Sequence, residues 1–271
     1  MIYTTASARS RPRLFRIATL SFAKCGKKMV LSPKERVRLI LAAATVYEPD
    51  LLITAGYAVH SLEHLNKVAR GFARHGYRGL LITEVHYDQP GKATRRMTHA
   101  MWAVHGSGEV YRLGPQIFGT SAEARAKRGA RAARFAQRLH ERTVTFHGLS
   151  AFGLCCGEIN IVQGRTQPRF LNDDAAAAIS KADIILNPTH DRMGNGGTLR
   201  AKRSFLSRQV IEGRNRLYVS CSNWESCGTN GKVQHPSPTL HTAYLSGQPL
   251  TYKEPADGSF GFVFRQWTAE L

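Results

Sequence analysis

Short apolar runs alternate with helical segments over the first 85 residues, and this order restricts the possible folds more than any other feature. The runs are LFRIATLSF at 14–22, PDLLITAG at 49–56 and GLLITEV at 79–85. The last two are of strand length and bounded by turn residues, which is typical of strands buried on both faces. Ser32, Pro33 and Glu35 predict a helix N-terminus. That helix over 32–47 and a second over about 60–75 complete a β-α-β-α-β order.

The remaining segments indicate antiparallel pairs and further covered strands. HAMWAVHGSGEVYRLG at 99–114 carries a Gly-Ser-Gly turn between two alternating segments and predicts a hairpin. A helix beginning near 121 precedes two consecutive strands at 142–148 and 149–156. Helices beginning near 172 and 199 then precede strands at 182–188 and 216–223, and the last forty residues suggest hairpins. We therefore predict an α/β fold, a four-layer α-β-β-α sandwich with mixed sheets. One domain over 14–271 would follow a basic extension at 1–13.

Composition fits a globular chain. The 271 residues are 42% hydrophobic, enough to form a substantial core. No apolar run approaches the roughly eighteen residues of a membrane-spanning helix, and we expect no membrane association. The basic N-terminus lacks a small-residue cleavage site after a continuous apolar region, which argues against a signal peptide.

The chain is strongly basic, with a formal net charge of +19. Much of the excess lies in one predicted helix at 121–142, where arginines recur at many helical angles. This pattern is typical of a solvated helix, with phosphate or partner binding as the alternative. We consider nucleic acid an unlikely partner, because no aromatic residues interleave the basic ones and no recognition motif is present.

The five cysteines have no CxxC spacing and are odd in number. They predict free thiols in a reducing, cytoplasmic location. Cys221 is expected to be a buried strand thiol and Cys227 a loop thiol. Cys155 and Cys156 end an apolar run in AFGLCCGEIN at 151–160. A tight turn after a strand can lift a nucleophile clear of a sheet, although a cysteine there can also be a small buried hydrophobic residue.

Two further motifs are weaker. HSLEH at 60–64 matches an inverted zinc-peptidase pattern, in which two histidines bind the metal. No third ligand follows in a helical context. We interpret Glu63 and His64 as solvated or cap-region polar residues and predict no metal. RMGNGG at 192–197 places glycines before a helix. It lacks the spacing of a nucleotide-binding loop and is interpreted as a long loop after a strand.

The second half of the chain resembles the nitrilase superfamily, the carbon–nitrogen hydrolases. The resemblance lies in LSAFGLCCGEIN, ADIILNPTHD, LRAKRSFLSRQ and NRLYVSCSNWES, which follow one another in the family's order. Cys156 takes the position of the family's nucleophile, with Glu158, Asn187 and Asn223 on other motif positions. With the first half included, the resemblance covers about residues 14–265.

The resemblance implies a glutamate general base, a lysine that stabilises the tetrahedral intermediate, and the cysteine. Here the glutamate position falls on Gly56 and the lysine position on Gln116. Neither can move a proton or supply a charge, and each loss could cost on the order of a hundredfold. Glu84, at the end of the next strand, and Glu123, near the family's second glutamate, are the candidate replacements. Arg112 could supply a charge.

The predicted function is therefore hydrolysis of an amide or nitrile through a covalent intermediate on Cys156. The alternative is a pseudoenzyme that keeps the fold as a binding or assembly module. Gly157, Glu158 and His190 are the predicted binding residues, with Gly157 among the backbone donors to the developing oxyanion. No cofactor is expected. The partners expected are a small amide or nitrile and further copies of the chain, because the resemblance implies a homodimer or higher homo-oligomer.

Overall fold

The computed structural model describes residues 14–87, 99–190, 196–208, 214–228 and 233–271. Its larger sheet has the order β17-β18-β1-β3-β5-β6-β7. The parallel strands are β1 (Leu14–Cys25), β3 (Leu51–Thr54) and β5 (Leu80–Tyr87), and the antiparallel ones are β6 (Ala100–His105), β7 (Val110–Pro115), β17 (Lys253–Asp257) and β18 (Phe262–Glu270). The predicted parallel core and the hairpin at 99–114 are both confirmed.

The second sheet has the order β16-β15-β13-β12-β9-β8. Its strands are β8 (Thr143–Phe146), β9 (Leu149–Gly153), β12 (Ile184–Thr189), β13 (Leu217–Ser222), β15 (His241–Leu245) and β16 (Gln248–Pro249). The strands β9, β12 and β13 are parallel and the flanking pairs are antiparallel. Both sheets are thus mixed.

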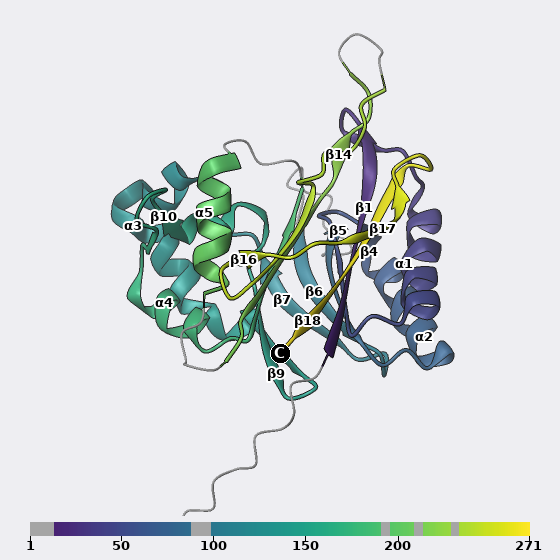
Figure 1. The fold of residues 1–271 in the computed structure, drawn as a ribbon, viewed down its shortest axis with the longest axis horizontal. Coiled ribbons are helices and arrows are strands. Elements are labelled where there is room, and N and C mark those ends of the chain that lie inside the picture. Colours follow the sequence, from purple (N-terminus) through teal and green to yellow (C-terminus); the bar gives the residue numbers. More distant parts are fainter. Residues whose placement is uncertain (1–13, 88–98, 191–195, 209–213, 229–232) are drawn as a thin grey trace, which may run out of the picture.

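The helices cover the outer faces of the two sheets (Figure 1). Helices α1 (Pro33–Tyr47) and α2 (Leu62–His75) pack on the larger sheet, and α3 (Ser121–Gln137), α4 (Asp173–Ser180) and α5 (Gly196–Leu206) pack on the other. The inner faces share a core of residues from both sheets, including Phe15, Ile53, Ile184 and Val219. The predicted α-β-β-α sandwich is confirmed.

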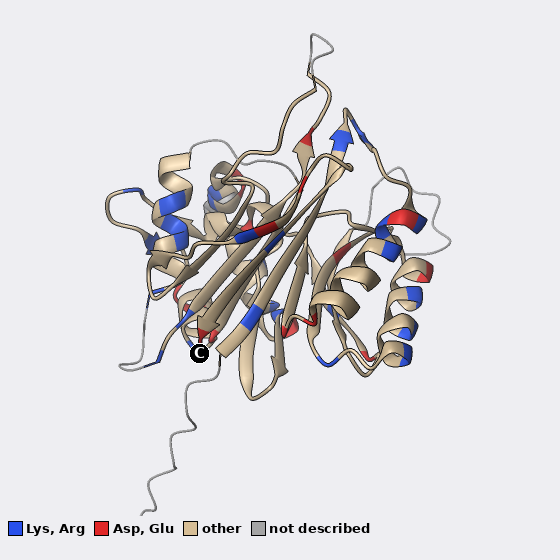
Figure 2. Cartoon of the chain, turned by 45° about the vertical axis from the view of Figure 1, so that its right-hand side comes forward, with Lys and Arg blue, Asp and Glu red and all other residues tan. Residues whose placement is uncertain are grey.

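Short elements complete the fold. They are β2 (Lys28–Met29), β4 (Val59–Ser61), β14 (Trp224–Glu225), the pair β10 (Val162–Gln163) and β11 (Arg169–Phe170), and the 3-10 helices η1 (Leu139–Arg142) and η2 (Cys156–Ile161). Among them, β2, β4 and β14 pair with strands of the larger sheet. The predicted helix at 121–142 is therefore α3 followed by η1. Lysine and arginine lie on helices at both sides of the sandwich (Figure 2). No helix in the described ranges has the length and apolar character needed to cross a membrane.

Cys25 and Cys227 form a disulfide across 202 positions of sequence. The prediction that Cys227 is a loop thiol was therefore wrong. The pairing was hidden because it depends on tertiary structure: β14 runs beside the end of β1, with Ala23 opposite Trp224, and this brings the two cysteines together. Cys155, Cys156 and Cys221 are free. The extension at 1–13 and most of RMGNGG lie outside the described residues.

Candidate active site

Cys156 lies in the sharp turn that follows β9. Its backbone has a φ of 45°, in the left-handed region that residues other than glycine rarely adopt. Gly157 then packs directly on Gly119, since a Cβ at position 157 would lie 1.9 Å from the Gly119 carbonyl oxygen. Only glycine fits there. Cys156 stays partly exposed while Cys155 is buried.

Buried polar side chains hold this turn. The Glu158 carboxylate accepts hydrogen bonds from the Cys155 N–H at 2.8 Å and the Ile117 N–H at 2.7 Å. It also pairs with Arg142 Nη2 at 2.9 Å. Burial raises the pKa of Glu158, although Arg142 and the two N–H groups oppose that shift. The carboxylate of this predicted binding residue is thus engaged in fixing the loop.

Asn187 ties the same turn to β12. Its Nδ2 donates to the Leu154 carbonyl at 2.7 Å and to the Cys156 carbonyl at 2.9 Å. Asn223 follows β13 and holds the larger sheet in the same way, because its Nδ2 donates to the Gly56 carbonyl after β3 at 2.6 Å. Two motif positions of the resemblance therefore anchor the backbone on either side of the site.

Glu84 and His190 meet between these two anchors. Glu84 lies on β5 and is fully buried, and His190 follows the end of β12. His190 Nε2 lies 2.6 Å from Glu84 Oε1 and 2.7 Å from Oε2. Burial lowers the pKa of His190, but the Glu84 charge and hydrogen bonds to Cys156 and Glu84 outweigh it and raise the pKa to about 10. An imidazolium therefore lies between the carboxylate and the thiol at neutral pH.

Gly56 leaves the space that His190 fills. A Cβ at position 56 would lie 2.3 Å from His190 Cδ2 and 3.0 Å from Glu84 Oε2. The Gly56 N–H also donates to the Thr189 carbonyl at 2.8 Å, which holds this turn against the end of β12. The position where the resemblance expects a carboxylate is thus occupied by an imidazole and bordered by a carboxylate from the next strand.

Tyr57 and His99 complete the surroundings, and sequence reasoning missed both. The Tyr57 ring stacks on His190, with centroids 4.0 Å apart and planes at 4°. His99 Nε2 lies 3.7 Å from Glu84 Oε1, and its ring meets His190 edge-on at 5.0 Å. Gln116 Oε1 lies 3.3 Å from His99 Nε2. Tyr57 could have been found because it directly follows Gly56, a position that the resemblance places in the site. No spacing in the sequence marks His99.

Glu123 is placed differently. Its carboxylate accepts from the Gly119 N–H at 2.7 Å and pairs with Arg131 at 2.9 Å, in the first turn of α3. Gly119 packs on Gly157, so Glu123 supports the neighbouring backbone. Arg112 is exposed on β7.

A metal ion could in principle use part of this cluster. One donor atom from each of Glu84, His99, Cys155 and His190 lies within 4.8 Å of the others, and this donor set suits zinc. In this structure the Cys155 thiol donates to Glu84, with Sγ 3.7 Å from Oε2. His190 Nε2 is already committed to Glu84. We therefore describe these side chains as a hydrogen-bonded cluster.

The zinc-like HSLEH segment has another arrangement. Glu63 forms an exposed ion pair with Lys67 at 2.6 Å, and His64 Nδ1 lies 2.8 Å from Ser61 Oγ. Within the ranges that the structure describes, these residues belong to no group of convergent metal donors.

Comparison with known proteins gives structural matches only. No family model and no curated protein matches the sequence. The amidase NitN of Nesterenkonia sp. AN1 has a TM-score of 0.55 at 14% identity, over 92% of this chain and 91% of that one. A variant of that amidase with a glutamate-to-glutamine and a cysteine-to-alanine substitution, solved with acrylamide, has a TM-score of 0.53 at 15% identity, over 97% and 93%.

A carbon–nitrogen hydrolase of Helicobacter pylori has a TM-score of 0.50 at 10% identity, over 93% of this chain and 88% of that one. At these identities the likeness concerns the fold and leaves the chemistry to the residues of this chain. The chain shares two mixed sheets and outer helices with these proteins, and the matches cover nearly all of it. It therefore has the fold of the nitrilase superfamily.

Proposed function

We propose that this protein is a carbon–nitrogen hydrolase that cleaves an amide or nitrile through a covalent intermediate on Cys156. His190 and Glu84 take over the proton transfer that the family assigns to residues absent here. The observation that carries the proposal is the placement of the His190 imidazole in the space left by Gly56, between the Glu84 carboxylate and Cys156. An acid–base pair in that space favours an active enzyme over a pseudoenzyme.

In the first half of the reaction, the Cys156 sulfur attacks the amide carbonyl carbon as a thiolate. A cation beside a thiol favours the thiolate, which is the more nucleophilic form. His190 Nε2 faces Glu84, and we assign the other ring nitrogen, Nδ1, to the thiol and substrate. The imidazolium gives its proton to the leaving nitrogen, the C–N bond breaks, and a thioester remains on Cys156.

In the second half, neutral His190 takes a proton from water, whose oxygen adds to the thioester carbonyl. The carbon–sulfur bond then breaks, releasing the carboxylic acid and restoring the thiolate beside the imidazolium. Glu84 keeps its hydrogen bonds to Nε2 throughout and fixes the ring. Backbone N–H groups after Cys156, beginning with Gly157, are the proposed donors to the developing oxyanion.

The alternative is a pseudoenzyme, favoured by the loss of the family's residues at Gly56 and Gln116. Alkylation by iodoacetamide, followed by peptide mass spectrometry, separates the two. Exposure alone already favours Cys156, because Cys155 and Cys221 are buried and the other cysteines are in a disulfide. The decisive comparison is therefore between wild type and His190→Gln.

We expect wild-type Cys156 to react at nearly the same rate from pH 8 to pH 6. In His190→Gln the rate should fall about tenfold for each pH unit below the ordinary thiol value of about 8.5. Hydrolysis of simple aliphatic amides, followed by ammonia release, should be lost in the same variant. Identical pH profiles for the two proteins, with no ammonia released by wild type, would support the binding module. The predicted homo-oligomer stays a prediction.

A further inference from the structure

A cavity of about 980 Å³ lies beside the candidate site. The turn between β1 and β2 and the start of α1 form its walls. Tyr57 also lines it, and this is the ring that stacks on His190. A molecule held in the cavity would therefore extend to the group next to the catalytic imidazole.

The cavity wall is predominantly cationic. Four of its side chains are basic, namely Lys24, Lys27, Lys28 and Arg36, whereas two are acidic, namely Glu35 and Glu225. Both carboxylates already accept backbone hydrogen bonds. Glu35 accepts from Ser32 N–H at 2.7 Å, and Glu225 from Gly26 N–H at 3.0 Å. These hydrogen bonds leave both acids charged, and the basic side chains of the wall still outnumber the acidic ones by two.

Arg36 is the buried member of this set, with an exposed fraction of 4%. Its Nε donates to the Ala58 carbonyl at 2.9 Å and its Nη1 to the Leu31 carbonyl at 2.8 Å. Those partners are neutral, and no ion pair joins Arg36 to a carboxylate among the described residues. A buried cation without an opposite charge is costly unless something else supplies one.

Two histidines in the same wall respond to that positive charge. The pKa of His60 is lowered, first by burial and next by Arg36. The pKa of His86 is lowered by burial and by His60, with Arg36 adding to the effect. Both imidazoles are therefore mainly neutral at pH 7.

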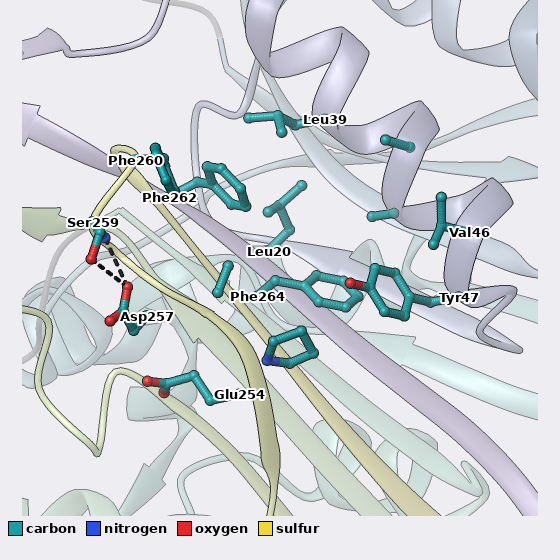
Figure 3. A pocket seen from close by; sticks show the side chains of 14 residues that line it. Leu20, Leu39, Val46, Tyr47, Glu254, Asp257, Ser259, Phe260, Phe262 and Phe264 are labelled. Atoms are coloured by element: carbon teal, nitrogen blue, oxygen red, sulfur yellow. Dashed lines mark hydrogen bonds between the residues drawn. The ribbon is translucent and has the colours of Figure 1, made fainter.

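The positive wall does not simply follow from the net charge of the chain. A second hollow, of about 720 Å³, lies between α1 and the β17–β18 hairpin. Its lining is mainly apolar, with Val46, Tyr47, Phe260 and Phe264, and its charged side chains, Glu254 and Asp257, are acidic (Figure 3). The charged side chains of the two hollows are thus of different sign, with a basic excess only at the one next to the site.

We propose that the cavity beside Tyr57 binds an anionic group of the substrate, a carboxylate, while the amide of the same molecule reaches Cys156. The inference rests on the proposed function and names its substrate class. The carboxylate would lie against Arg36 and the β1–β2 lysines. Opposite charge in a partly closed cavity raises the local concentration of such a ligand.

The test compares amides that differ only in charge. Succinamate, glutaramate and adipamate are each assayed against the methyl-ended amide of the same length. We expect kcat/KM to be about tenfold or more higher for at least one of the three carboxylates in 20 mM salt, and the preference to shrink in 500 mM salt. Lys27→Gln/Lys28→Gln should reduce the preference at least threefold. Lys67→Gln, an exposed lysine on α2, is the matched control and should leave the preference unchanged.

Calorimetric titration with adipate and with neutral adipamide provides a readout that does not need turnover. Selective adipate binding that weakens in the lysine double variant, without any hydrolysis, would keep the anion site and overturn the proposed function. Hydrolysis with equal kcat/KM for charged and neutral amides of every length would keep the function and overturn the anion site.

Discussion

The two sheets contribute different halves of the candidate site. The second sheet supplies Cys156, Asn187 and His190, and there Asn187 holds the turn of the proposed nucleophile through two short hydrogen bonds. The larger sheet supplies Gly56 and Glu84, and there a glycine stands at the position where the resemblance implies a carboxylate. In this fold, neighbouring parallel strands end at one edge. A carboxylate at an adjacent strand end, as we propose for Glu84, can therefore serve the same site while Cys156 keeps its place.

Removing the relocated pair should have the largest effect. We expect His190→Gln to lower kcat for amide hydrolysis by about a hundred- to a thousandfold, because the leaving nitrogen loses its proton donor. Glu84→Gln should lose at least tenfold, since it keeps the shape of the side chain but removes the charge that stabilises the imidazolium. Steady-state ammonia release measures both changes.

Circular dichroism would show whether each variant keeps the fold. Glu123→Gln serves as the comparison on α3, where the carboxylate contacts Gly119 and Arg131. Should Glu123→Gln lower kcat more than Glu84→Gln does, Glu123 would be the carboxylate that supports the reaction, and the comparison of the two sheets would fail.

Refilling the position of the lost carboxylate should have an intermediate effect. In Gly56→Ala, the added methyl would lie 2.3 Å from His190 Cδ2, so the imidazole must shift. We expect kcat to fall about ten- to a hundredfold, since displacement of a catalytic group by about 1 Å can cost that much. Gly196→Ala is the control, because a Cβ there meets nothing within 4 Å. Unchanged kcat in Gly56→Ala would show that His190 is not held by this space.

The fold was predictable because its signals are local. Buried runs such as 79–85 show where strands lie, and the capping box of Ser32 and Glu35 forms as the spacing predicts. The boundaries were less accurate. The basic segment at 121–142 ends its α-helix at Gln137 and continues as a 3-10 turn, where Arg142 is drawn inward to pair with buried Glu158.

The site was predictable only in part, since it depends on distances that no sequence pattern carries. Glu84 and His190 are 106 positions apart, and each was identified as a candidate because it ends a strand. Their contact through the space at Gly56 was hidden, because the sequence does not show which side chain enters a gap. The Cys25–Cys227 disulfide, over a still longer separation, was missed for the same reason.

The smallest effect concerns the contact between the sheets away from the site. His241 on β15 lies 2.7 Å from Thr19 Oγ1 and 2.7 Å from Ser21 Oγ on β1, and it is buried. Burial, and then Arg265, hold the pKa of His241 well below its usual value. Below about pH 6.5, the ordinary pKa of a histidine, the unfolded chain therefore binds a proton at His241 while the folded chain leaves it neutral.

Stability from His241 is accordingly complete above about pH 6.5 and is lost as the pH falls, at up to about 1.4 kcal/mol per pH unit. His60 and His86 also have lowered pKa values and add to the slope. We expect His241→Gln to be less stable at pH 8 but to lose stability less steeply between pH 6.5 and pH 5. The number of protons taken up on unfolding should fall by up to one in this variant. Urea unfolding at each pH measures this, with exposed His235→Gln as control. An equally steep slope in His241→Gln would mean that His241 takes up its proton as readily in the folded chain as in the unfolded one, and the acid sensitivity would then come from other groups.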